Sequence, residues 1–336
     1  RIGQWYNGGT NRLDGRLAEV IVYNRVLSLL EINIVQSYLS AKYNISISND
    51  KYNGDLPANG NNDIAVVGLG VLSGDSSKLV HSEGIQLQIS QDFDDGDYVL
   101  LGHNTEENTI NSSDVNGSLQ SRWDRAWWLD ITNSGNTVNC DFSFSLIEGD
   151  VGYSGLNQSG VSDYKLIHRT GTSGNWTIIA SATSLLANKI VFEDVDISAD
   201  GYYTVATIDV NSSIGVSPVS TNSKGPGGVG GIDGTTNLKV WLNTGDQEGE
   251  DGDEILSIGD ESGNGNDLTQ LTTINIPSLE SNAVNGRSAV SFNGSNGYLD
   301  GIMNFNFTPP LTVFTVAYFN NLNQANDDND YVYIKF

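Results

Sequence analysis

The sequence has little of the chemistry that builds disulfides, metal cages and basic surfaces. It contains one cysteine, three histidines and 16 lysines and arginines among 336 residues. The single Cys140 excludes an internal disulfide and a cysteine-based metal site. The histidines, His81, His103 and His168, are widely spaced, which argues against a histidine-based zinc site.

The shortage of basic residues leaves a strongly acidic chain with a formal net charge of -25. Such a surface repels phosphate, so nucleic acid is excluded as a partner. The acidic excess fits a secreted, soluble surface that collects divalent cations, and solubility alone explains it equally well. No apolar run is long enough to span a bilayer, so the chain is not expected to be membrane-spanning.

The sequence contains no signal peptide, and Arg1 is not a natural start, which indicates a processed chain or a fragment. Its length predicts two or three domains. Proline is scarce, whereas glycine, asparagine, serine and threonine are plentiful, a mixture typical of many short strands joined by turns. We therefore predict an all-β protein built from antiparallel β-sandwiches, with one short helix.

Residues 1–45 are expected to form one segment. After a turn at Asp14-Gly15, Leu17 to Tyr23 is apolar on both faces apart from Glu19, as in a strand covered on both sides. Ser28 and Glu31 have the spacing of a capping box and predict a helix that ends near Lys42-Tyr-Asn44.

Residues 46–208 are predicted to be a central β-sandwich module. Its first part, 46–62, is polar and rich in turn residues and is interpreted as a domain boundary. Alternation over Val138–Leu146 directs Cys140 and its apolar neighbours inward, which predicts a core position for this cysteine. Residues 209–235 have linker composition, and a new domain is predicted over 236–336.

Two stretches resemble parts of one known domain type. Leu238–Leu299 carries Trp-Leu, Asp-x-Ser-Gly-Asn-Gly-Asn-Asp and Phe-Asn-Gly-Ser-Asn-Gly-Tyr-Leu, and it resembles the first half of a concanavalin A-like (laminin-G-like) lectin or glucanase domain. Leu13–Tyr43 resembles the last part of the same domain type, in the form found in large secreted Bacteroidota proteins. The central region is similar to an uncharacterised β-sandwich module of such proteins.

The order of these parts has two explanations. A domain end, a whole module and a domain beginning are what a window cut from a tandem array would contain, and this is the predicted organisation. Alternatively, Leu238–Phe336 and Arg1–Ile45 belong to one circularly permuted domain. The two differ in whether Leu17–Tyr23 finds its sheet partners in Leu238–Phe336.

Calcium is the cofactor that the residues themselves suggest, because it prefers hard oxygen ligands in turns. The candidate ligands are Asp92, Asp94, Asp95, Asp97, Asp260 and Asp267. They form two clusters, one at residues 92–97 and one with Asp260 and Asp267. Neither cluster matches an EF-hand loop, and solvated turns are the alternative interpretation.

Aromatic side chains beside turns are candidates for stacking on sugars. They are Trp5, Tyr6, Trp123 and Trp176, and packing in a core is the alternative role. No enzyme activity is expected. The glucanase pattern Glu-x-Asp-x-x-Glu is absent, and no serine–histidine–acid spacing stands out.

Together these features favour a piece of a large, repetitive, secreted cell-surface adhesin that attaches to glycans or abiotic surfaces, with roles in gliding or biofilm formation. The alternatives are a non-catalytic carbohydrate-binding region of a polysaccharide-degrading enzyme and a structural spacer without a ligand. The resemblance implies type IX secretion, an extracellular location at the cell surface, and contacts with neighbouring repeats and the type IX translocon.

Overall fold

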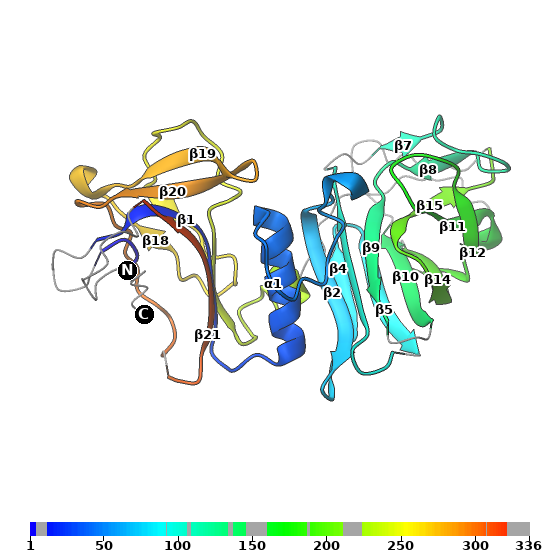
Figure 1. Cartoon of the computed structure of the whole chain (residues 1–336), viewed down its shortest axis with the longest axis horizontal. Coiled ribbons are helices and arrows are strands. Elements are labelled where there is room, and N and C mark those ends of the chain that lie inside the picture. Colours follow the sequence, from blue (N-terminus) through cyan, green and yellow to red (C-terminus); the bar gives the residue numbers. More distant parts are fainter. Residues whose placement is uncertain are drawn as a thin grey trace. The chain divides into compact units, whose positions relative to one another are not determined.

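The computed structural model describes residues 1–4, 12–91, 93–105, 109–133, 137–145, 160–186, 189–210, 224–306 and 308–320. They fall into two compact units (Figure 1). One combines Arg1–Leu27 with the chain from Gly230 onward, and the other is Ser28–Val229. The predicted all-β class is confirmed, because both units consist of antiparallel sheets and α1 (Leu29–Tyr43) is the single α-helix in the described ranges.

The first unit is organised around β1 (Asp14–Tyr23). One edge of β1 pairs with β20 over Asp14–Leu17 and with β16 over Glu19–Tyr23, while the other edge pairs with β21. The other strands of this unit are β16 (Leu238–Asn243), β17 (Ser257–Ile258), β18 (Leu268–Thr269), β19 (Ser278–Val284), β20 (Arg287–Asn293) and β21 (Thr312–Phe319). A strand that is buried on both faces needs partners on both edges, and residues from the far end of the sequence supply them.

The observed boundaries differ from the predicted ones. Residues 1–45 and 236–336 were expected to lie in separate domains, but β1 shares one sheet with β16, β20 and β21. The division falls after Leu27, so α1 belongs to the second unit rather than to the strand before it. The pairing is the one that the permuted alternative requires. Its physical reason is the apolar character of Leu17–Val22, which is fully buried only between these partners.

The second unit is a two-layer sandwich. Its smaller sheet has the order β13-β14-β10-β5-β4. Its larger sheet has the order β12-β11-β15-β9-β6-β2-β3, with β8 attached to β15 and β7 attached to β8. The strands are β2 (Ile64–Leu72), β3 (Asp75–Ser77), β4 (Leu79–Ser82), β5 (Ile85–Gln91), β6 (Tyr98–His103), β7 (Ile110–Asn111), β8 (Ser121–Trp123), β9 (Trp127–Thr132), β10 (Val138–Ser145), β11 (Tyr164–Arg169), β12 (Thr177–Ser181), β13 (Ser184–Leu186), β14 (Lys189–Ile197) and β15 (Gly201–Thr207).

The core between these sheets follows the predicted alternation of β10. Val138, Cys140, Phe142 and Phe144 are each 0% exposed and pack in the main cluster, and Leu146 lies outside the described residues. Cys140 is therefore a core residue, as predicted. Burial raises the pKa of its thiol far above the ordinary value.

Helix α1 covers β2 on the outer face of the larger sheet (Figure 1). The predicted capping box is present: Ser28 Oγ accepts a hydrogen bond from Glu31 N at 3.3 Å, and Glu31 Oε2 accepts one from Ser28 N at 3.0 Å. Gly68 permits the close approach, because a Cβ there would lie 3.2 Å from Ile34 Cγ1. Asn44, in the left-handed conformation, ends the helix and turns the chain toward residues 44–56.

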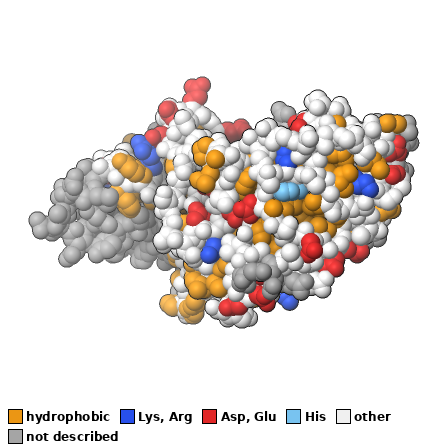
Figure 2. Space-filling model, turned by 45° about the vertical axis from the view of Figure 1, so that its right-hand side comes forward, with side chains coloured by type: hydrophobic (Ala, Val, Ile, Leu, Met, Phe, Trp, Pro, Cys, Tyr) orange, Lys and Arg blue, Asp and Glu red, His pale blue; other side chains and the backbone are white. Residues whose placement is uncertain are grey.

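Acidic side chains are scattered over the visible surface and basic ones are few (Figure 2), as the net charge of -25 requires. Among the described residues, no helix combines the length and apolar character needed to cross a bilayer.

Candidate functional site

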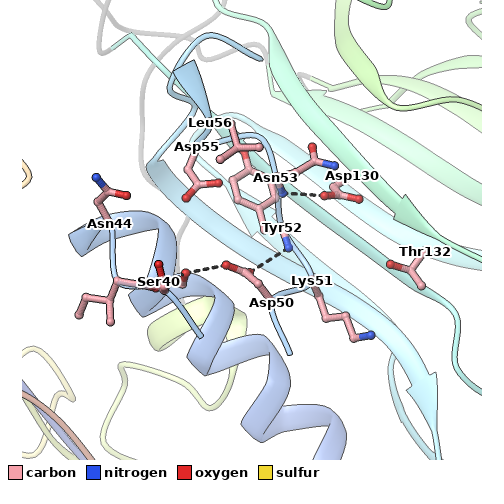
Figure 3. A pocket seen from close by; sticks show the side chains of 12 residues that line it. Ser40, Asn44, Asp50, Lys51, Tyr52, Asn53, Asp55, Leu56, Asp130 and Thr132 are labelled. Carbon is pink, nitrogen blue, oxygen red and sulfur yellow. Dashed lines mark hydrogen bonds between the residues drawn. The ribbon is translucent and has the colours of Figure 1, made fainter. Parts of the chain in front are cut away.

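A pocket of about 440 Å³ lies in the second unit, between the C-terminal end of α1, the segment 44–56 and the end of β9 (Figure 3). Its volume is within the range of small-molecule sites. Three carboxylates line it, from Asp50, Asp55 and Asp130. Amide and hydroxyl groups come from Asn44, Ser46, Asn53 and Thr132, and apolar surface comes from Ile45, Tyr52 and Leu56.

Hydrogen bonds to α1 and β9 fix the segment that forms the wall. The Lys51 amide donates to Ser37 Oγ at 2.9 Å, and the Ser40 hydroxyl donates to Asp50 Oδ2 at 2.6 Å. On the other side, the Asn53 amide donates to Asp130 Oδ2 at 2.7 Å. The segment is thus tied to two regular elements, which gives its polar side chains defined positions (Figure 3).

Tyr52 forms the floor of the pocket. It is 4% exposed, and its hydroxyl donates to the Asn62 carbonyl at 2.7 Å. Burial raises the pKa of this phenol well above its ordinary value, and the nearby Asp55 and Asp130 raise it further. Beside this floor, Ile45 and Leu56 are 37% and 51% exposed, so the pocket offers apolar surface next to hydrogen-bonding groups.

The carboxylates of the pocket are held in an environment that disfavours their charge. Burial raises the pKa of Asp130 to about 7, with the charge of Asp200 as the second cause. Burial raises the pKa of Asp55 to about 6, with Asp50 as the second cause. Near neutral pH, the pocket therefore holds carboxyl groups that gain or lose a proton readily.

The candidate calcium ligands do not line this pocket. In the first cluster, Asp94 and Asp95 are exposed, and Asp97 is buried with its Oδ2 accepting from Asp94 N at 2.8 Å. Asp95 Oδ1 accepts from the Ser73 amide. The carboxylates of Asp95 and Asp97 organise this turn, and Asp92 lies outside the described residues.

In the second cluster, Asp260 organises a loop. Its Oδ1 accepts from Trp241 N and Ser262 N at 2.8 and 3.0 Å, and its Oδ2 accepts from Ser262 Oγ and Asn266 N at 2.8 and 2.9 Å. Asp267 Oδ1 accepts from the Asp260 amide at 2.8 Å. Both oxygens of Asp260 already accept two hydrogen bonds each, so the lone pairs that a cation would need are occupied. This carboxylate is therefore a poor metal ligand.

Over the described ranges, no group of three or more histidine, cysteine, aspartate or glutamate side chains is arranged to hold a metal ion. Calcium binding stays a prediction.

Two of the proposed sugar-stacking rings are in the interior, so their assignment is wrong. Trp123 is 0% exposed and packs against Trp127 with 4.8 Å between ring centroids. Trp176 is 3% exposed, and two guanidinium carbons lie near the centre of its ring, that of Arg169 at 4.2 Å and that of Arg122 at 5.0 Å. Neither ring can stack on a sugar, because the neighbouring sheet residues already cover both. The other two candidates, Trp5 and Tyr6, lie outside the described residues.

Sequence reasoning missed the residues of the pocket. Asp50 and Asp55 lie in 46–62, a stretch interpreted as a domain boundary because of its turn residues. Asp130 lies in an apolar strand, beside Trp127 and Trp128. An acid within such a strand was the available signal, since a buried carboxylate needs a reason to be there.

Comparisons of the chain with protein-family models, with curated proteins and with solved structures found no match. The resemblance to concanavalin A-like domains therefore stays a prediction.

Proposed function

We propose that this chain is a non-catalytic, glycan-binding part of a large secreted cell-surface adhesin, and that the pocket at residues 44–56 is its binding site. The observation that carries the proposal is the lining of that pocket. Amide, hydroxyl and carboxylate groups lie beside exposed apolar side chains, all within about 440 Å³. A sugar presents the matching pattern of hydroxyl groups and apolar C–H faces.

The concanavalin A-like resemblance and the acidic, soluble composition support a secreted surface location, with calcium, neighbouring repeats and the type IX translocon as further proposed partners. The alternatives are a binding region of a polysaccharide-degrading enzyme and a spacer without a ligand. Weak binding to one sugar unit fits an adhesin, because repeated modules multiply weak contacts into firm attachment.

Asn44 offers a sharp test of the site. Replacing it with glycine removes the amide but keeps the left-handed backbone that ends α1. The chain would first be screened on a glycan array, and the strongest binder titrated by calorimetry. We expect Asn44→Gly to weaken binding by about three- to ten-fold, the value of one hydrogen bond.

The matched control is Asn61→Gly, which makes the same change at an exposed, left-handed asparagine that does not line the pocket. This variant should bind like the wild type. If no glycan binds the intact chain, the spacer is favoured. Release of new reducing ends from a bound polysaccharide would refute the non-catalytic assignment.

A further inference from the structure

The pocket contains three carboxylates and no side chain that neutralises them. None of Asp50, Asp55 and Asp130 forms an ion pair with a cationic group in the described part of the chain. The one basic residue of the lining, Lys51, places its Nζ 5.3 Å from the centre of the Tyr98 ring. Figure 3 shows its side chain extending away from the aspartates.

Two of these carboxylates also have oxygen atoms that the protein does not use. Asp130 is 7% exposed, and its Oδ2 accepts from the Asn53 amide. Its Oδ1 has no hydrogen-bond partner among the described residues. Asp55 Oδ1 is buried and likewise has none within those ranges. Of the two, Asp55 Oδ1 is closed off inside the fold, whereas Asp130 Oδ1 is not among the fully enclosed oxygens and can accept a hydrogen bond from a ligand in the pocket.

The expected donor is an organic cation rather than a metal ion, because in the described ranges no three acidic side chains are grouped for metal coordination. We propose that the pocket selects glycans that carry a free primary amine, with the ammonium group placed at Asp130 Oδ1. This inference rests on the proposed function, since it names the sugar class that the same site prefers.

Each part of such a ligand has a counterpart in the pocket. An ammonium group has three N–H donors and can donate to Asp130 Oδ1 without moving the Asn53–Asp130 hydrogen bond, which uses Oδ2. The ring hydroxyls can bond with the amides and hydroxyls of the lining. Uronic acids are disfavoured, because they would add a negative charge to a pocket that already has three carboxylates.

The test compares short oligomers of one length: glucosamine, N-acetylglucosamine and a uronic acid, titrated by calorimetry at low and high salt. Near neutral pH we expect glucosamine oligomers to bind at least about ten-fold more tightly than the N-acetylated ones, as a charge-assisted hydrogen bond predicts. Lowering the pH to about 5 protonates Asp130 and Asp55, so the preference should fall to within about three-fold. Asp50, Asp63 and Asp200 are the other charged groups that act on this pair.

Asp130→Asn and Asp55→Asn each remove one charge and keep an acceptor, so each should reduce the amine preference several-fold. The matched control is Asp196→Asn on β14, an exposed aspartate outside the pocket, which should change nothing. This control matters because a chain with a net charge of -25 attracts cations everywhere.

The possible failures can be told apart. If neutral and amine-bearing oligomers bind equally well and Asn44→Gly weakens both, the glycan-binding proposal stands and the amine preference is refuted. If amine-bearing oligomers bind better but the pocket variants retain the full preference, the attraction is non-specific and the inference is wrong. If none of these oligomers binds but another glycan of the array does, the amine preference is refuted and the glycan-binding proposal stands; if no glycan of the array binds either, both proposals fail.

Discussion

Replacing Asp130 with asparagine should stabilise the second unit at alkaline pH and leave its stability unchanged at acidic pH. The pKa of Asp130 is raised from 3.8 to about 7, so the folded state binds its proton more tightly than the unfolded state. Stability from this group is fully present below about pH 4 and is lost as the pH rises through about 7. At about 1.4 kcal/mol per pKa unit, the loss reaches about 4 kcal/mol by pH 7. Asparagine never ionises, and its side-chain oxygen can still accept from the Asn53 amide.

Guanidinium unfolding followed by tryptophan fluorescence measures this difference, because Trp123, Trp127, Trp128 and Trp176 all lie in the second unit. The free energies of unfolding of the wild type and the variant should agree near pH 4 within about 1 kcal/mol, diverge steadily between about pH 4 and pH 7, and keep a nearly constant difference above pH 7. Asp196→Asn, on an exposed strand position, should not diverge. A constant difference between wild type and Asp130→Asn across this range would show that the carboxyl is not held protonated by the fold.

Three further predictions concern the core of the second unit, the sheet of the first unit and the loop that carries the motif Asp-x-Ser-Gly-Asn-Gly-Asn-Asp. Cys140 should resist thiol reagents in the folded chain and react fully after unfolding, since its side chain is 0% exposed and its thiol pKa is raised; rapid labelling of the native chain would contradict this. Arg16 and Tyr318 are paired across β1 and β21, so cysteines at both positions, in a Cys140→Ser background, should oxidise to a disulfide within one chain. A disulfide-linked dimer on a non-reducing gel would mean that another copy supplies β21. Gly263 and Gly74 both have positive φ, but only at Gly263 would a Cβ strike another residue, the carbonyl oxygen of Ile232. Gly263→Ala should therefore destabilise the first unit by at least about 1 kcal/mol more than Gly74→Ala destabilises the second unit. Equal losses in thermal unfolding would refute the steric account.

Local patterns in the sequence predicted local structure well. The capping box at Ser28 and Glu31, and the inward alternation of β10, both depend on neighbours within a few residues. The all-β class follows from composition in the same way. The partners of β1 could not be predicted, because the apolar character of a strand predicts that it is buried but does not identify the strands that pair with it. Its partners begin more than two hundred residues later, at Leu238.

The proposed sugar-stacking tryptophans also show that local sequence does not determine which strands lie next to a residue. A tryptophan beside a turn is compatible with exposure and with burial, and the side chains that other strands bring next to it decide between them. For Trp123 the decision comes from Phe144, at 6.4 Å between ring centroids, and for Trp176 from the guanidinium of Arg169. Phe144 lies on β10, at a sequence distance from Trp123 that no turn pattern encodes, and Arg169 lies at the end of β11, the strand that pairs with β12 beside Trp176.

The residues that are easiest to recognise in this sequence and the residues that form the pocket are different sets, for a physical reason. In Asp-x-Ser-Gly-Asn-Gly-Asn-Asp, Asn264 and Asn266 donate to the carbonyls of Leu238 and Lys239 at 2.9 and 2.7 Å, so the motif closes a loop over β16. Such a loop needs particular residues at fixed spacing, which makes it visible as a motif. The pocket instead depends on a hydrogen bond between Asp130 and the Asn53 amide, which are 77 positions apart in the sequence. The raised pKa of Asp130 comes from its burial and not from its residue type. A binding site of this kind becomes visible only when the fold brings its parts together, and charge measurements on Asp130 are therefore more informative about function than the motif.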